Sequence, residues 1–330
     1  MSTQTSELPR VAVTFGDPAG IGPELVARLL SDPRTRASAD LVLLADEEEL
    51  RSAGEDAGVD LGWARELLHP APPAVGRPEG GFQRKAATAE GGRWALGRLK
   101  TGLDLARAGE VGAMLFAPLN KSSLHLAGMT QSDELRWFEE DLGVDSFTSE
   151  LNVVPGLWTA RVTSHVSIAD VAAGITYERV SAAGRLLDRV LRGAGVEAPR
   201  IGVCALNPHA GENGHFGRHE LDIITPAIGG LRESGLDVSG PFPSDTIFLK
   251  ARAGEFDGVL TMYHDQGQIA MKLMGFDGGV TIAGGLPIPI CTPAHGTAFD
   301  LVGRGAANTG SIQNAFDLAV RLARRGPGRG

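Results

Sequence analysis

The stretch RVAVTFGDPAGIGPE, residues 10–24, decides the type of fold. Residues 10–15 form an apolar, strand-like run, and the glycine-rich segment 16–24 follows it directly. Pro23 stands at an early position of the helix expected next, where a missing backbone N–H is tolerated. The order of strand, glycine loop and helix predicts a βα unit, whose helix start can hold an anion or a cofactor.

The glycine loop itself carries no specific nucleotide-binding motif. It does not match the Gly-x-Gly-x-x-Gly pattern, and it lacks the lysine of a phosphate-binding P-loop. A plain tight turn and a ligand contact therefore both stay open as interpretations of Gly16 and Asp17.

Further strand-like runs recur along the chain, with amphipathic helical stretches such as 92–108 and 178–192 between them. Strands that alternate with helices pair in parallel and are covered on both faces. We therefore predict an α/β fold with a mostly parallel sheet, whose ligands gather at the carboxyl ends of the strands. The further runs are residues 40–45, 111–116, 159–163, 201–205, 258–262 and 280–283.

The composition excludes several classes of function. The chain has 330 residues and a formal charge of −9, which fits one large or two medium domains and gives no basic face for nucleic acid. No apolar run approaches the ~20 residues of a membrane helix. The amino terminus lacks the features of a signal peptide, and both cysteines lie in apolar segments. We therefore expect a cytoplasmic protein with reduced thiols.

Three histidines follow predicted strands: His165, His209 and His264. Loops that follow parallel strands meet at one edge of the sheet, so three imidazoles from such loops can form an open metal site. A single histidine at a strand end is more often a hydrogen-bonded polar residue, and the spacings of 44 and 55 residues match no motif. The residues alone leave both interpretations open.

Polar residues near these histidines are further candidates. Asp265 can orient an imidazole ring. Lys272 lies within an apolar run, where it either extends its stem to solvent or, beside a metal, polarises a carbonyl or donates a proton. Asp245 is another isolated polar residue, for which a catalytic role and a helix cap are the alternatives.

The segment HGTAFDLVG, residues 295–303, resembles the adenosine-binding segment of the isocitrate and isopropylmalate dehydrogenases. Those enzymes bind NAD or NADP without a Rossmann fold. Glycine and small residues let the backbone approach a cofactor, while a simple glycine turn is the alternative. The resemblance implies a set of cofactor-binding residues, with Asn207 added beside His209. These residues are Asn207, His295, Gly296, Thr297, Ala298 and Asn308.

Taken together, the chain resembles the 4-hydroxythreonine-4-phosphate dehydrogenase family from its first strand to its last helix. The resemblance implies an isocitrate-dehydrogenase-like α/β fold of two lobes, an active site in the cleft between them, and a homodimer. It also implies one divalent metal ion (zinc, magnesium or manganese) on His165, His209 and His264, with one histidine from the partner subunit. The matching segments are residues 16–24, 117–121, 163–165, 206–212, 240–246, 262–267, 285–287 and 295–300.

The same resemblance assigns the lobes and two lysines. Residues 1–127 with 296–330 would form the cofactor lobe, and residues 128–295 would form the lobe with the metal and the dimer contact. Lys272 matches a substrate-binding lysine of the family, and Lys121 is a possible loop contact.

The substrate-binding positions depart from the family pattern. Ser132 and Asp133 replace a His-Thr pair. Thr281 replaces an asparagine, and Ile290 replaces an arginine. Because a phosphate needs positive charge and strong donors, these changes favour a hydroxy acid without phosphate. The alternatives are the phosphorylated substrates of the family, 4-phosphohydroxy-L-threonine and four-carbon sugar-acid phosphates.

The expected reaction is the oxidation of a β-hydroxy acid, followed by decarboxylation. The metal would lower the pKa of the substrate hydroxyl, hydride would pass to the nicotinamide, and Lys272 would hold the substrate or donate a proton. Two other classes of protein stay as alternatives: a phosphate acetyltransferase-like enzyme and a non-catalytic metal- or nucleotide-binding protein.

Overall fold

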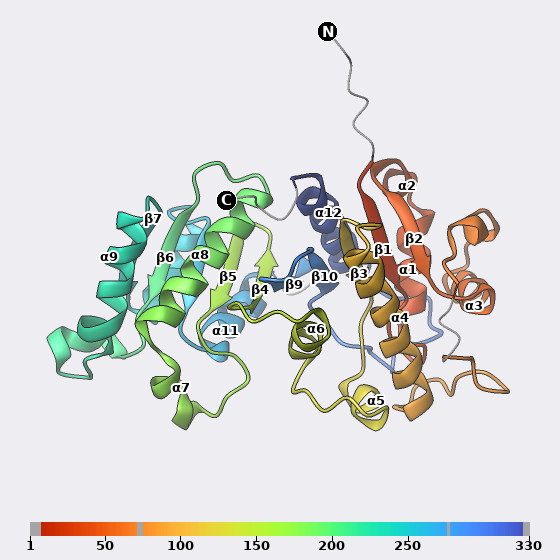
Figure 1. The fold of residues 1–330 in the computed structure, drawn as a ribbon, viewed down its shortest axis with the longest axis horizontal. Coiled ribbons are helices and arrows are strands. Elements are labelled where there is room, and N and C mark those ends of the chain that lie inside the picture. The colour runs from red at the N-terminus through yellow and green to blue at the C-terminus, as the bar shows by residue number, and fades with distance from the viewer. Residues whose placement is uncertain (1–7, 71–74, 276–277, 326–330) are drawn as a thin grey trace, which may run out of the picture. The chain divides into compact units, whose positions relative to one another are not determined.

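A computed structural model describes residues 8–70, 75–275 and 278–325. These residues divide into two compact units (Figure 1). The first unit takes the described residues up to Gly143 and those from Ile288 onward, and the second takes Val144–Pro287.

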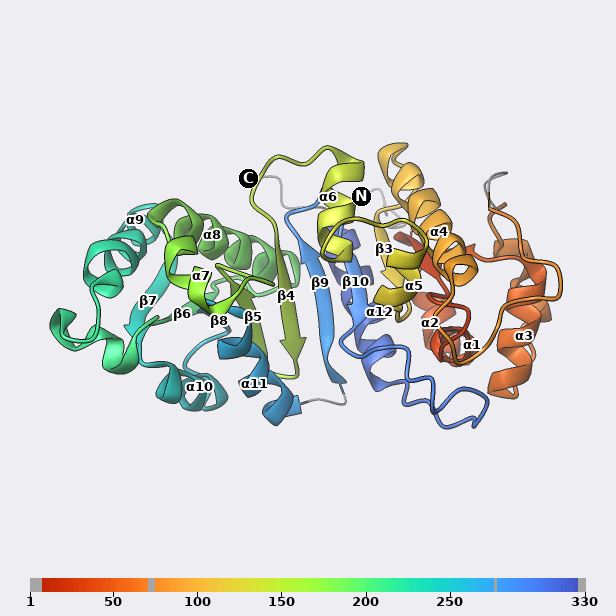
Figure 2. The same ribbon diagram turned by 90° about the horizontal axis from the view of Figure 1, so that it is seen from below.

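The first unit contains four parallel strands in the order β2-β1-β3-β10. Helix α4 covers one face of these strands, and α12 and α1 lie on the other face (Figure 2). The elements are β1 (Arg10–Thr14), α1 (Gly22–Ser31), α2 (Pro33–Ser38), β2 (Asp40–Leu44), α3 (Glu47–Ala57), η1 (Gly62–Leu67), α4 (Ala89–Arg107), β3 (Ala113–Phe116), α5 (Lys121–Leu126), α6 (Glu134–Leu142), β10 (Ile290–Pro293) and α12 (Gly310–Arg325).

The second unit contains six strands in the order β9-β4-β5-β8-β6-β7. Strand β4 runs antiparallel to both β5 and β9, whereas β5, β8, β6 and β7 pair in parallel. Helix α8 covers one face, and α10 and α11 cover the other (Figure 2). The elements are β4 (Ser149–Val154), β5 (Leu157–Arg161), α7 (Ile168–Gly174), α8 (Tyr177–Gly193), β6 (Arg200–Cys204), η2 (Pro208–Gly214), η3 (Glu220–Ile224), α9 (Thr225–Glu233), β7 (Asp237–Phe242), α10 (Ser244–Arg252), β8 (Gly258–Thr261), α11 (His264–Gly275) and β9 (Val280–Gly284).

The predicted α/β class with a mostly parallel sheet is confirmed, and each predicted strand lies within a few residues of an observed one. Sequence patterns missed β4, β7 and β10. Strand β4 is half polar, β7 contains a Gly-Pro pair, and β10 is only four residues long. None of these is a continuous apolar run, which was the pattern used to find strands.

The two compact units divide the chain at somewhat different positions from the approximate lobes expected from the sequence. Residues 128–143 and 288–295, which the sequence placed in the second lobe, belong to the first unit. The reason is packing, because α6 contacts α4 and β10 pairs with β3.

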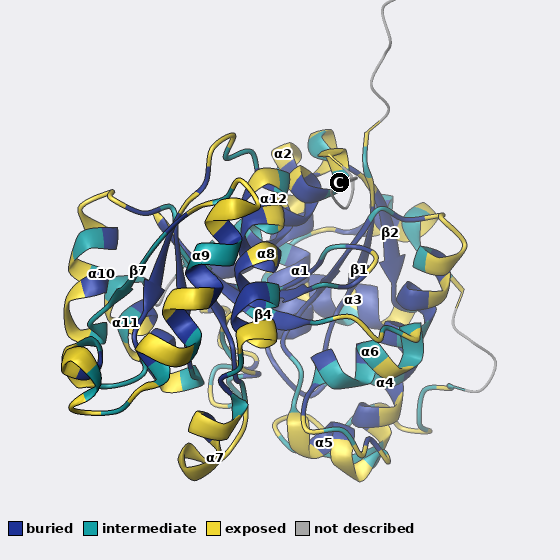
Figure 3. Cartoon of the chain, turned by 60° about the vertical axis from the view of Figure 1, so that its left-hand side comes forward, coloured by how far each residue is buried: buried dark blue, intermediate teal, exposed yellow. Residues whose placement is uncertain are grey.

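Both units bury their strands under amphipathic helices, as Figure 3 shows by the dark blue strands and the yellow outer helix faces. In the second unit, one apolar cluster joins β8 and α10 through Val259 and Ile247, with Met271 of α11 packed on it. Within the described ranges, no helix is long and apolar enough to cross a membrane.

Close packing of α4 on α5 depends on glycine at position 92. A Cβ atom added there would lie 1.9 Å from the backbone oxygen of Ser123. By contrast, a Cβ atom at Gly229 of α9 would meet nothing within 4 Å. The two glycines therefore form a matched pair for testing the packing.

We predict that Gly92→Ala lowers the free energy of unfolding by about 1–3 kcal/mol, because backbone must move to make room. Gly229→Ala should raise the free energy of unfolding by about 0.5–1 kcal/mol, since alanine is the better helix former. Urea unfolding followed by circular dichroism measures both values. Equal effects of the two substitutions would contradict the close α4–α5 contact.

A buried charged cluster ties α3 to α4. Glu49 accepts a hydrogen bond of 3.0 Å from the Trp94 indole, and the guanidinium of Arg98 stacks on that ring at 4.1 Å from its centroid. Burial raises the pKa of Glu49 from 4.5 to about 7, although nearby Arg98 opposes the shift. The folded state therefore holds a proton on Glu49 more tightly than the unfolded chain does.

This shift predicts a pH dependence of stability. The contribution of Glu49 is fully present below about pH 4.5 and is lost as the pH rises through about 7. The wild-type melting temperature should therefore fall between pH 5 and pH 8 by a few degrees more than that of Glu49→Gln. Glu47→Gln, an exposed change on the same helix, is the control and should behave like the wild type.

Candidate functional site

Two of the three predicted metal ligands lie together in the second unit. His165 lies in the loop after β5, and His264 is the first residue of α11, just after β8. Strands β5 and β8 are parallel neighbours, so both loops leave the sheet at the same edge. The ring centroids of His165 and His264 are 5.5 Å apart, with the ring planes at 45°.

The ring of His264 is held by its neighbour in sequence. Its Nδ1 lies 2.6 Å from Oδ1 of Asp265, as expected for a residue that orients an imidazole, and this contact leaves Nε2 for a ligand. Burial lowers the pKa of His264, and the positive charge of Arg161 adds to this, while the hydrogen bond with Asp265 opposes it. The lowered pKa favours the neutral ring, which is the form that binds metals.

His209 lies in a strained turn after β6, and in the described part of the chain it is not grouped with the other two histidines. The four non-glycine residues at positions 209, 210, 212 and 213 have φ between 43° and 53°, a left-handed conformation that costs each about 1 kcal/mol or more. The ring of His209 contacts Phe216, at 6.1 Å between centroids. Among the residues that the structure describes, no three His, Cys, Asp or Glu side chains are grouped to hold one metal ion.

Glu220, which the sequence reasoning missed, accepts hydrogen bonds from the residues that precede the His209 turn. Its Oε1 accepts hydrogen bonds from the backbone N–H groups of Leu206 (2.9 Å) and Asn207 (2.7 Å). Its Oε2 accepts one from the Asn207 side chain at 2.9 Å. Burial alone would raise the pKa of Glu220, but these hydrogen bonds outweigh it and lower the pKa. Asn207, predicted to bind cofactor, is thus engaged within the fold.

We predict that Glu220→Ala loosens the His209 turn, because the N–H groups of Leu206 and Asn207 lose their acceptor. Removing a charged acceptor should cost about 1.5–3 kcal/mol of stability and speed hydrogen exchange of those two amides. Hydrogen-exchange mass spectrometry on peptides that cover residues 201–216 measures the change. Glu212→Ala, at an exposed position of the same turn, should leave the exchange of these amides unchanged.

Gln266 is a second residue that the sequence reasoning missed. Its Oε1 accepts a hydrogen bond of 2.6 Å from the N–H of Met262, and its Nε2 donates to the Ala205 oxygen at 2.8 Å. Nε2 also donates to Oγ of Ser244 at 2.7 Å. One buried amide therefore links the ends of β6 and β8 to the start of α10. The sequence around Gln266 contains no motif that predicts this linking role.

The predicted catalytic residues Lys272 and Asp245 are both exposed, on α11 and at the start of α10. Thr281, a predicted substrate contact, lies in β9 and is half-buried. Its Oγ1 accepts a hydrogen bond of 3.0 Å from the Asn152 side chain on β4.

In the first unit, the glycine loop (residues 16–24) contacts the predicted cofactor segment (residues 295–303). The N–H of Ile21 donates to the Thr297 oxygen at 3.0 Å, and a Cβ atom at Gly20 would lie 2.8 Å from Cβ of Thr297. Glu24 accepts a hydrogen bond of 3.2 Å from the N–H of Ala307. Two segments far apart in sequence therefore pack against each other through buried residues.

Other predicted cofactor residues reach the surface of the first unit. Gly296 and Asn308 are exposed, and His295 and Ala298 are half-buried. Asn308 also caps the start of α12, because its Oδ1 accepts from the N–H of Gly310 at 2.8 Å.

The structure favours the tight turn for Gly16 and Asp17. Gly16 has φ +77°, and a Cβ atom there would lie 2.5 Å from the oxygen of Ala117. Asp17 is buried, and its Oδ1 accepts a hydrogen bond of 2.8 Å from the N–H of Ala19. Burial raises the pKa of Asp17. Lys121, by contrast, is exposed at the start of α5.

Three residues predicted to bind substrate are Asp133, Ser132 and Ile290, and their contacts lie within the first unit. Asp133 is buried and caps α6, because its Oδ1 accepts from the N–H of Arg136 at 3.0 Å. Exposed Ser132 donates to the other oxygen of Asp133 at 3.1 Å. Ile290 is fully buried in β10, opposite Met114 of β3. The prediction that Ile290 contacts substrate is therefore corrected, since its side chain packs in the interior.

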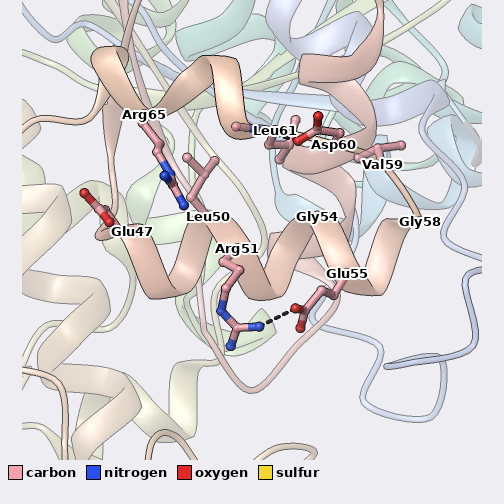
Figure 4. A pocket seen from close by; sticks show the side chains of 11 residues that line it. Glu47, Leu50, Arg51, Gly54, Glu55, Gly58, Val59, Asp60, Leu61 and Arg65 are labelled. Atoms are coloured by element: carbon pink, nitrogen blue, oxygen red, sulfur yellow. Dashed lines mark hydrogen bonds and ion pairs between the residues drawn. The ribbon is translucent and has the colours of Figure 1, made fainter.

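A hollow in the first unit lies between α3 and η1 (Figure 4). Its lining includes Leu50, Val59 and Leu61, and the ion pair of Arg51 with Glu55 lies beside them. None of the predicted site residues lines it. The hollow is therefore separate from the candidate site.

The fold makes this chain an α/β protein with a mostly parallel sheet and two neighbouring histidines at strand ends. Comparison with known proteins identifies its family. A family model described as "Pyridoxal phosphate biosynthetic protein PdxA" matches residues 55–319, and the chain belongs to this family. A relative from Pseudomonas aeruginosa, "Putative 4-hydroxythreonine-4-phosphate dehydrogenase 2", is 54% identical over 96% of this chain and 98% of its own. The "D-threonate 4-phosphate dehydrogenase" of Salmonella typhimurium is 36% identical over 96% and 100%.

Solved structures agree with this assignment. A 4-hydroxythreonine-4-phosphate dehydrogenase from Klebsiella pneumoniae has a TM-score of 0.81 and 33% identity, and the match covers 98% of this chain and 100% of that one. An isocitrate dehydrogenase from Methylococcus capsulatus has a TM-score of 0.52 and 14% identity, over 96% and 88% of the two chains. The expected family and the isocitrate-dehydrogenase-like fold are thus confirmed.

Proposed function

We propose that this chain is a metal- and nicotinamide-dependent dehydrogenase that oxidises the hydroxyl group of a phosphorylated hydroxy acid, with decarboxylation after the oxidation. The observation that carries the proposal is the pair of imidazoles, His165 and His264, at the carboxyl ends of two adjacent parallel strands. The names of the relatives, which describe dehydrogenases of four-carbon acid phosphates, support it.

The residues present fit a divalent metal ion. His165 and His264 offer two imidazoles within reach of one ion, and Asp265 fixes the ring of His264 so that Nε2 stays available. When bound, the ion would supply Lewis-acid activation of the substrate hydroxyl, and zinc, magnesium and manganese are the candidates. Exposed Lys272, on the same helix as His264, would bind the substrate or deliver a proton, and Asp245 is the second candidate for proton transfer.

The third ligand, His209, would come from a partner subunit. The proposal rests on the grouping of only two histidines within the described part of this chain. Exposed apolar side chains support a partner beside them: Val166 follows His165 and is 52% exposed, and Phe216 contacts His209 and is 47% exposed. Burying these side chains in an interface would remove apolar surface from water, which is favourable. A homodimer would place His209 of each subunit in the site of the other.

Subunit mixing tests this arrangement. His209→Ala and His264→Ala should each be inactive alone. If the two are unfolded and refolded together in equal amounts, about half of the dimers are mixed, and each mixed dimer has one intact site out of two. About a quarter of the wild-type activity should therefore return. No recovery in a mixture shown to contain mixed dimers would contradict a shared site.

NAD or NADP would bind at the surface of residues 295–308, which pack on the glycine loop. Backbone at Gly296 and side chains of His295 and Asn308 are accessible there. Because this surface belongs to the first unit and the histidines belong to the second, His264→Ala should keep its affinity for the dinucleotide. Isothermal titration with NAD and with NADP, with and without chelator, measures this and identifies the preferred dinucleotide.

The expectation of an unphosphorylated substrate is not supported by the two relatives named above, whose names specify phosphorylated compounds. Two departures that favoured it also have explanations within the fold. Asp133 caps a helix, and Ile290 packs in the core. We therefore place the substrate among the four-carbon hydroxy-acid phosphates.

A substrate panel tests this assignment. We expect NADH or NADPH formation with 4-phosphohydroxy-L-threonine or D-threonate 4-phosphate, at a kcat/KM at least about tenfold above that of the unphosphorylated acids, because one charged contact contributes about 1.5–3 kcal/mol. A chelator should abolish the reaction, and the metal should restore it. A preference for unphosphorylated acids would overturn the substrate class, while no reduction of either dinucleotide would overturn the proposed function.

A further inference from the structure

Helix α11 carries three polar side chains at a spacing of four residues: His264, Gln268 and Lys272. Residues four apart are neighbours on a helix surface, and eight residues span about 12 Å along the axis. Gln268 therefore lies between the imidazole and the ammonium group on which the proposed function relies. Any substrate that reaches from one to the other passes Gln268.

One hydrogen bond joins Gln268 to Asn152 of the sheet, and a second joins Asn152 to Thr281. Its Nε2 donates to Oδ1 of Asn152 at 2.6 Å, and Nδ2 of Asn152 donates to Oγ1 of Thr281 at 3.0 Å. Asn152 and Thr281 are directly opposite each other on antiparallel β4 and β9. Asn152 is only 8% exposed, whereas Gln268 and Thr281 are half-buried. The central amide is thus interior, and both ends of the chain of hydrogen bonds reach the surface.

The direction of these hydrogen bonds determines which donors Thr281 and Gln268 keep for a ligand. The Thr281 oxygen accepts from Asn152, so its own hydroxyl hydrogen is left to donate. Nε2 of Gln268 uses one of its two hydrogens on Asn152 and keeps the second. Two neutral donors that share Asn152 as their hydrogen-bond partner suit an oxygen of an anionic group, which takes hydrogen bonds that are shorter and stronger than neutral ones.

We propose that Gln268 and Thr281 bind an acid-group oxygen of the substrate, between the metal-binding end and Lys272, and that Asn152 is the residue that positions them. The acid group is a carboxylate or a phosphate, which share this chemistry. The inference rests on the proposed function and adds two residues, Asn152 and Gln268, that set substrate specificity. A purely structural network would affect stability and leave substrate affinity unchanged.

Single substitutions test the two donors. Thr281→Val and Gln268→Leu remove a donor without adding charge, and each should raise KM for the preferred acid about tenfold, with a smaller effect on kcat and none on dinucleotide affinity. Thr281→Ser restores the hydroxyl and should return KM to near the wild-type value. Gln313→Leu makes the same change on α12, in the first unit, and should leave KM unchanged.

A double-mutant cycle tests the positioning role of Asn152. If Asn152 acts through Thr281, then Asn152→Leu raises KM, and the pair Asn152→Leu with Thr281→Val is no worse than the more affected single variant. Additive effects on KM would show that Asn152 does not act through Thr281. Melting temperatures of all variants identify any that lose their fold, and Asn152→Asp is the substitute where Asn152→Leu does so.

The source of the acid oxygen is assigned by repeating the Thr281→Val and Gln268→Leu measurements on an analogue without phosphate. A KM penalty that persists assigns the carboxylate, and one that disappears assigns the phosphate. Unchanged KM in folded Thr281→Val and Gln268→Leu, on every acid that the wild type oxidises, overturns the inference. A wild type that oxidises none of these acids overturns the proposed function instead, so the two failures are distinct.

Discussion

The parallel pairing of β5 with β8 is the constraint on which the rest of the candidate site depends. Both strands end at the same edge of the second unit, and this alone brings His165 and His264 to 5.5 Å between ring centroids, although they are 99 residues apart in the chain. An antiparallel pair would have sent the two loops to opposite edges. The order of strands therefore decides that these two imidazoles lie side by side.

Buried polar side chains then hold the loops at this edge in fixed positions. Gln266 connects the ends of β6 and β8, and Glu220 holds the left-handed turn that carries His209. Each of these side chains satisfies backbone groups that no strand or helix can pair, so removing it leaves buried donors or acceptors without partners. The loops next to the histidines are thus anchored by buried hydrogen bonds, which helps a site to hold reacting groups in place.

Much of the fold could be predicted from sequence because the buried strands of α/β proteins are apolar runs that lie between amphipathic helices. The runs at 10–15 and 258–262 gave strands close to where they lie. Alignment with the family was less informative about single residues. Ile290 and Asp133 stand where substrate contacts were expected, yet one packs in the core and the other caps a helix. Side-chain direction and capping depend on neighbours that are distant in sequence, such as Met114 of β3.

By itself, the sequence determined the α/β class, the family and the three histidines at strand ends, because hydrophobic periodicity and short motifs are local properties of the chain. Only the tertiary structure decided which histidines meet, that Asn152 and Gln268 lie in a chain of hydrogen bonds with Thr281, and that the glycine loop locks onto Thr297. These contacts join residues up to 276 positions apart, from Ile21 to Thr297, and depend on strand order and register, which no local pattern encodes.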